Sequence, residues 1–97
     1  MKVAIITGAS RGIGACVAEG LVSDGYLVAL VARSRDALEQ VADRITRNHP
    51  VGAPLVVTYP LDVQDHKAVE AMVSSVVSRF GQIDLLFNNA GIGLGGS

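Results

Sequence analysis

Three glycines in one short segment are the first residues of this sequence whose spacing could do chemistry. Gly8, Gly12 and Gly14 form a G-x-x-x-G-x-G pattern between an apolar run over residues 3–6 and a segment with helical periodicity. A glycine-rich loop in this context presents backbone N–H groups to phosphate, and the lack of a following Lys-Ser/Thr pair excludes a nucleoside-triphosphate loop. We expect Gly8 to permit a tight turn, Gly12 to let backbone approach a pyrophosphate, and Gly14 to let the helix pack near the strand. The alternative is a structural turn with Ser10 as a helix cap.

Arginines rather than an acid follow the second apolar run. Residues 27–32 end without Asp or Glu, and Arg33 and Ser34 come next. A site for NAD usually places an acid there to bind the ribose hydroxyls, whereas a planar guanidinium suits a ribose 2′-phosphate. Ser34 can add a hydroxyl, and Arg11 could approach the same phosphate from the other side. The sequence therefore favours NADP(H) over NAD(H), the alternative being that both arginines are solvated surface charges.

Two further polar segments follow predicted strands. Asp62, in Leu61-Asp62-Val63, could accept a hydrogen bond from an adenine amino group, or could belong to an ordinary strand–helix turn. In Asn88-Asn89-Ala90-Gly91 we expect the amides to tie adjacent strand ends together and the small residues to let backbone lie close to a ligand. A turn rich in Asn and Gly is the alternative for this segment.

The elements that must position these residues alternate between strand and helix. Apolar runs predict strands over residues 3–6, 27–32, 53–59 and 83–87. Helical periodicity predicts one helix over about 11–24, a second that Ser34 caps and residues 48–50 end, and a third between Asp65 and Gly81. This order predicts an α/β fold, a Rossmann-like parallel sheet in the order β-α-β-α-β-α-β that is an incomplete doubly wound fold. Residues 1–97 form part of one domain, with a ligand crevice at the carboxyl ends of the strands.

Composition limits the partners of the chain. With 97 residues, 49% apolar and 18% charged, and a mean hydropathy of +0.42, the sequence is that of a folded chain. A net charge of −1 argues against nucleic acid as a partner. A single cysteine and two distant histidines predict neither a disulfide nor a metal site, which fits a reducing, cytoplasmic setting. No apolar run is long enough for a membrane span, and the run at the start is too short for a signal peptide.

Several other residues have structural interpretations. The first helix carries an apolar stripe of Ile13, Cys16, Val17, Gly20 and Leu21, so Cys16 is expected in the core. Met72 and Phe80 belong to the buried stripe of the third helix, and His49 and His66 are expected to be solvated.

As a set, these motifs closely resemble the short-chain dehydrogenase/reductase family in its classical, NADP-preferring form. The likeness covers the whole chain and rests on the order of the glycine loop, the Asp62 segment and the Asn-Asn-Ala-Gly segment. It implies a glycine loop around the pyrophosphate, an arginine that marks NADP, an Asp near adenine, and an Asn-Asn-Ala-Gly segment that supports the sheet and the adenosine ribose. The implied cofactor-binding residues are Gly8, Ser10, Arg11, Gly12, Ile13, Gly14, Arg33, Ser34, Asp62, Val63, Asn89, Ala90 and Gly91.

The catalytic residues that the resemblance implies are not in this chain. The family uses a later Asn, a Ser and a Tyr-x-x-x-Lys pair, but Leu30 and Val63 stand four residues after the tyrosines Tyr26 and Tyr59. We therefore expect the NADP(H)-binding first part of an oxidoreductase that acts on a carbonyl or alcohol substrate, with possible homo-oligomers and no activity in the 97 residues alone. A non-catalytic dinucleotide-binding module is the alternative. A methyltransferase-like fold is disfavoured by the glycine spacing and the Asn-Asn-Ala-Gly segment.

Overall fold

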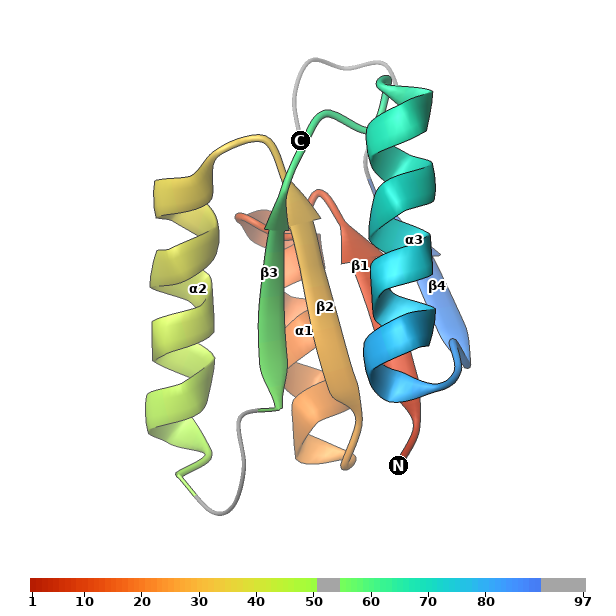
Figure 1. Ribbon diagram of the computed structural model, residues 1–97. Coiled ribbons are helices and arrows are strands. Elements are labelled where there is room, and N and C mark those ends of the chain that lie inside the picture. Colours follow the sequence, from red (N-terminus) through yellow and green to blue (C-terminus); the bar gives the residue numbers. More distant parts are fainter. Residues whose placement is uncertain (51–54, 90–97) are drawn as a thin grey trace.

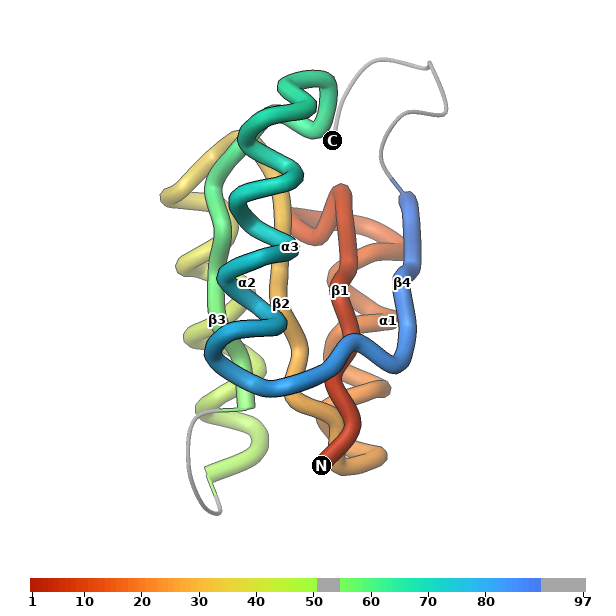
Figure 2. The backbone as a smooth tube through the Cα atoms, turned by 45° about the vertical axis from the view of Figure 1, so that its right-hand side comes forward, coloured from red at the N-terminus to blue at the C-terminus, as the bar shows by residue number. Residues whose placement is uncertain are grey.

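The computed structural model describes residues 1–50 and 55–89 and contains four strands and three helices in strict alternation (Figures 1 and 2). The strands pair in parallel in the order β3-β2-β1-β4, so the predicted α/β class and parallel sheet are confirmed. After β3 the chain crosses to the far side of β1 to form β4, which places a topological switch point between β1 and β4. The elements are β1 (Val3–Thr7), α1 (Gly12–Ser23), β2 (Leu27–Ala32), α2 (Arg35–Asn48), β3 (Val56–Pro60), α3 (His66–Phe80) and β4 (Leu85–Asn88).

Five strand boundaries differ from the sequence prediction: β1, β3 and β4 each end one residue later, at Thr7, Pro60 and Asn88, and two strands begin later. β3 begins at Val56 rather than 53, and residues 51–54 lie outside the described residues. β4 begins at Leu85 rather than 83, because Asp84 pairs with Val3 through its side chain as well as its backbone. The Asp84 carboxylate accepts the Val3 N–H at 2.8 Å, while the Asp84 N–H donates to the Val3 carbonyl at 2.8 Å. Regular pairing with β1 therefore starts one residue later.

The sheet is covered on both faces (Figure 1). Helices α1 and α2 lie on one face and α3 lies on the other. Successive residues of β1 alternate between the two cores, with Ala4 and Ile6 facing α1 and α2 and Val3 and Ile5 facing α3. Burial on both faces explains why β1 and β2 are continuous apolar runs in the sequence.

The predicted apolar stripe of α1 is wrong in part. The buried residues of this helix are small, namely Gly14, Ala15 and Ala18, together with Val22. Val17 and Leu21 of the predicted stripe are half-buried against the same core, and the small residues let the helix lie close to the sheet. Ile13 is 67% exposed, and Cys16 is also exposed rather than part of the core.

Polar contacts join the C-terminal halves of α1 and α2. His49 Nε2 lies 2.8 Å from Ser23 Oγ, and its Nδ1 donates to the Ile45 carbonyl at 3.0 Å. Asn48 donates to Glu19 at 2.8 Å. The expectation of a solvated His49 is therefore wrong, since this ring is half-buried and bridges the two helices, whereas His66 is exposed as expected.

The third helix matches its sequence pattern in part, since Val73 and Val77 of its predicted stripe are 37% and 45% exposed. Met72 and Val76 are buried, and Phe80 is half-buried against the same core. Gly81 ends the helix in the left-handed region at φ 88°. At the edge of the sheet Leu85 and Leu86 of β4 are 38% and 60% exposed. No helix in the described part of the chain is long and apolar enough to cross a membrane.

Candidate functional site

The carboxyl ends of β1 and β4 are joined by a small hydrogen-bond network. The Thr7 hydroxyl donates to the Asn88 side-chain oxygen at 2.9 Å and accepts the Asn89 N–H at 3.0 Å. The Asn89 side-chain amide also donates to the Gly8 carbonyl at 3.4 Å. These contacts confirm the expectation that the amides tie adjacent strand ends together, and they fix the start of the glycine loop. Thr7 belongs to the glycine motif, but its central place in this network was not predicted.

The glycine loop has the backbone geometry that its spacing predicts. Gly8 and Gly12 adopt φ of +63° and +62°, a region that side chains disfavour. A Cβ on Gly12 would meet no atom within 4 Å, so the space beside this residue is open. A Cβ on Gly14 would collide with the Gly8 carbonyl oxygen and would lie 3.1 Å from the Ala9 Cα. The loop is held against β2 by the Ala9 N–H, which donates to the Val31 carbonyl at 3.1 Å.

Helix α1 begins at this loop without a capping side chain. Its N-cap residue, Arg11, has extended backbone and makes no side-chain capping hydrogen bond, and the first turn contains no acidic residue. By contrast, Ser34 caps α2 and Asp65 caps α3, each accepting an N–H at 3.2 Å. The N-cap position is taken by Arg11 and not by Ser10, the residue that the sequence offered as a cap. An uncapped N-terminus carries partial positive charge that favours an anion.

A pocket of about 620 Å³ lies between the loop and the segment that joins β2 to the first turn of α2. It is lined by Ser10, Arg11, Arg33, Ser34 and Ala37. None of the described residues that line it is acidic, and the two arginines predicted to clamp one phosphate line this pocket together. Ser34 Oγ accepts the Ala37 N–H, so its hydroxyl hydrogen is still able to donate to a ligand.

The remaining predicted site residues that the structure describes lie outside the lining of this pocket. Ile13, at the start of α1, is largely exposed. Asp62 follows β3, and its Oδ1 accepts the Gln64 N–H at 2.9 Å, which is the turn that the sequence left as an alternative. Among the described residues, no other group donates to its second carboxylate oxygen, while Val63 is half-buried in the core under α3. The predicted residues Ala90 and Gly91 lie outside the described residues.

Among the described residues there is neither a metal site nor a tyrosine in the lining of the pocket that contains Arg33. Over residues 1–50 and 55–89, no group of three His, Cys, Asp or Glu side chains could hold a metal ion. The Tyr59 hydroxyl lies 2.9 Å from Ser75 Oγ and accepts a hydrogen bond from Arg79 at 3.1 Å, on the α3 side of the sheet. Ala37 lines the pocket but was not predicted, because an alanine in a helix carries no chemical signal in the sequence.

Comparison with known proteins places this geometry in a family. Residues 2–97 match the short chain dehydrogenase family. The chain is 43% identical over 91 residues to an uncharacterized oxidoreductase of Staphylococcus saprophyticus, a match that covers 94% of this chain and 38% of that protein.

Solved structures agree in fold and sequence. A beta-ketoacyl-[ACP] reductase of Bacteroides thetaiotaomicron is 40% identical with a TM-score of 0.87, over 95% of this chain and 40% of that one. L-sorbose reductase of Gluconobacter frateurii, solved in complex with NADPH and L-sorbose, is 43% identical with a TM-score of 0.83, over 95% of this chain and 34% of that one. The chain thus spans well under half the length of these relatives. With a family match over nearly its whole length, the chain belongs to the short chain dehydrogenase family.

Proposed function

We propose that this chain forms the NADP(H)-binding part of an oxidoreductase that transfers hydride between a nicotinamide cofactor and a carbonyl or alcohol substrate. The observation that carries the proposal is the pocket in which Arg11 and Arg33 stand together beside the glycine loop, with no acid among its described lining residues. Two guanidinium groups suit a ribose 2′-phosphate, which NADP(H) has and NAD(H) lacks. The NADPH complex of the similar L-sorbose reductase supports the same choice.

The residues present fit such a cofactor. The open space beside Gly12 and the uncapped start of α1 suit a pyrophosphate, which the backbone N–H groups would hold. Arg11, Arg33 and Ser34 would hold the 2′-phosphate, and the Asp62 carboxylate would accept the adenine amino group. Ser10 and Ile13 border the loop, and by family resemblance Val63, Asn89, Ala90 and Gly91 would lie along the adenosine. When bound, the cofactor supplies or accepts the hydride.

A non-catalytic dinucleotide-binding module is the second candidate, because the chain has no tyrosine followed by lysine at the fourth position. Hydride transfer to a carbonyl needs an acid or base within hydrogen-bond reach of the reacting oxygen. These 97 residues alone are therefore expected to bind NADPH without oxidising it. Sustained NADPH oxidation by the purified chain with a panel of aldehydes and ketones, above a no-protein control, would contradict this expectation.

Replacing Arg33 tests the cofactor assignment. Arg33→Ala should weaken the binding of NADP(H) by about 1.5–3 kcal/mol, the range for a hydrogen bond to a charged group. This corresponds to an affinity about ten- to a hundred-fold lower. The affinity for NAD(H) should be nearly unchanged, because NAD(H) has no 2′-phosphate. Calorimetric titration of the wild type and the variant with both cofactors measures the two effects.

The matched control is Arg35→Ala, which removes the same charge two residues away at a position outside the lining of the pocket. This variant should keep the affinity for NADP(H) within about two-fold. Equal losses for both cofactors in Arg33→Ala would reduce Arg33 to a general electrostatic role. An unchanged affinity for both would make it a surface charge.

A further inference from the structure

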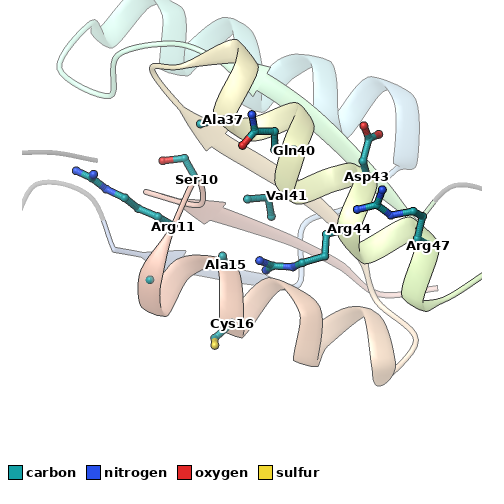
Figure 3. Close-up of a pocket in the computed structure, with 11 residues that line it drawn as sticks. Ser10, Arg11, Ala15, Cys16, Ala37, Gln40, Val41, Asp43, Arg44 and Arg47 are labelled. Carbon is teal, nitrogen blue, oxygen red and sulfur yellow. The ribbon is translucent and has the colours of Figure 1, made fainter.

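A second pocket lies between α1 and α2, next to the pocket that contains Arg33 (Figure 3). We call it the α1–α2 groove; its volume is about 620 Å³. Its polar lining consists mainly of Arg11 at the loop end and Gln40, Asp43, Arg44 and Arg47 along α2. None of these four side chains of α2 lines the pocket that contains Arg33. The groove therefore needs an explanation of its own.

The charge of the groove is opposite to that of the chain. Three arginines and one aspartate line it, which gives a net charge of +2, whereas the whole chain carries −1. Arg44 is partly neutralised by Glu19, at 3.8 Å. In the described part of the chain Arg11 and Arg47 have no ion-pair partner. The positive charge that Arg11 and Arg47 add along this groove favours an anionic ligand.

The side chains of α2 are spaced to serve one elongated ligand. Gln40, Arg44 and Arg47 follow at steps of four and three residues, so they share one side of the helix. Figure 3 shows Arg44 extending from α2 toward α1, and Arg47 pointing back along α2 toward Arg44. Arg44 lies two turns, about 10 Å, beyond Ala37, which borders the predicted 2′-phosphate site. The backbone of Arg44 thus lies well beyond the predicted 2′-phosphate position, and Arg47 lies almost one further turn along α2.

We propose that the α1–α2 groove binds a linear oligophosphate, or the oligophosphate portion of a small molecule. Arg44 and Arg47 pair with phosphates at one end of the ligand. Gln40 donates a hydrogen bond from its side-chain amide to a phosphate oxygen, and Arg11 pairs with the phosphate at the loop end of the groove. An oligophosphate presents several anionic groups in a row, which matches the row of arginines along the groove.

The groove and the Arg33 pocket share Ser10, Arg11 and Ala37. A ligand that reaches the loop end of the groove therefore excludes the 2′-phosphate of NADP(H). This antagonism rests on the proposed function, whereas binding in the groove does not. The groove is thus a site at which an oligophosphate regulates cofactor binding.

Inorganic tripolyphosphate is a suitable probe, titrated by calorimetry at constant ionic strength without any dinucleotide. The double variant Arg44→Gln/Arg47→Gln should bind it about ten-fold more weakly than the wild type. Glu19→Gln should bind it more tightly, because this change frees Arg44 from its ion pair. Lys67→Gln, which removes one exposed charge on α3 across the sheet, and Arg33→Ala, outside the groove, should both bind it like the wild type. Thermal melts of each variant establish that it is folded.

The second arm measures NADP+ affinity in the presence of tripolyphosphate. At a tripolyphosphate concentration equal to its own Kd, the apparent Kd for NADP+ should double in the wild type and stay nearly constant in the double variant. Equal tripolyphosphate binding by the wild type and the double variant would overturn the proposal, as would a loss confined to Arg33→Ala. If NADP+ does not bind at all, the proposed function fails, and the first arm alone decides the groove.

Discussion

The N-terminus of α1 differs from the N-termini of α2 and α3. Ser34 and Asp65 each place an oxygen on a backbone N–H of the helix that follows, whereas Arg11 places none on α1. A helix start without a cap is less stable by about 0.5–2 kcal/mol. In this fold the uncapped start is the one that follows the glycine loop at the switch point of the sheet. The chain thus satisfies backbone N–H groups with its own side chains at the starts of α2 and α3, and does not do so from the N-cap residue of α1, where a pyrophosphate is expected.

The largest expected effect comes from closing the space between α1 and the loop. Gly14→Ala would push a methyl group into the Gly8 backbone, which cannot move without distorting the loop. We expect a loss of stability at the upper end of the range for overpacking, about 3 kcal/mol, and loss of measurable NADP(H) binding. Urea denaturation and cofactor titration measure the two effects.

Gly20→Ala is the matched control for Gly14→Ala, in the same helix. A Cβ at Gly20 meets no atom within 4 Å, so this variant should gain about 0.5–1 kcal/mol from the lower entropy of its unfolded state. It should also leave the affinity for NADP(H) unchanged. Similar stability for the two alanine variants would contradict the close approach of α1 to the loop.

An intermediate effect should separate capping from binding. Ser34→Ala and Asp65→Ala should each lower the free energy of unfolding by about 1 kcal/mol, because each removes a cap. Arg11→Ala should change the free energy of unfolding by less than about 0.5 kcal/mol, since no capping contact is lost. It should nevertheless lower the affinity for NADP(H) about ten-fold. Asp65→Ala should leave NADP(H) affinity unchanged. A stability loss for Arg11→Ala equal to that of Ser34→Ala would remove the distinction between the two helix starts.

The parts of this molecule that the sequence predicts are those set by local chemistry. Caps at Ser34 and Asp65, the end of α3 at Gly81 and the roles of Gly8 and Gly14 follow from the preferences of single residues and their neighbours. Periodicity predicted the contact face of α1 only in part, because Val17 and Leu21 contact the core whereas Ile13 and Cys16 do not. That face depends on how closely the helix lies against the sheet, and this distance is set by contacts between residues far apart in the sequence.

Two other features could not be predicted for the same reason. The bridge between His49 and Ser23 joins residues 26 positions apart, and the α1–α2 groove forms only when two helices lie side by side. Neither the bridge nor the groove leaves a pattern in the sequence that would predict it. The site itself was easier to predict, because in a parallel sheet the ends of the strands necessarily meet at one edge.

The smallest expected effect concerns the start of β1, where the chain again satisfies its own backbone as it does at α2 and α3. The Val3 N–H, and then the Gln82 side-chain amide, donate to the Asp84 carboxylate and hold the pKa of that carboxyl below its ordinary value of 3.8. Because the pKa is lower in the folded state, this stabilisation is complete above the unfolded value and is lost as the pH falls through the folded value. Asp84→Asn should therefore be less stable than the wild type at pH 7, and the two should converge as the pH falls well below 3.8. Urea denaturation across this range measures the difference, with the exposed Glu70→Gln as a control that should follow the wild type at every pH. A difference between Asp84→Asn and the wild type that is independent of pH would mean that the side chain acts through its shape and not through its charge.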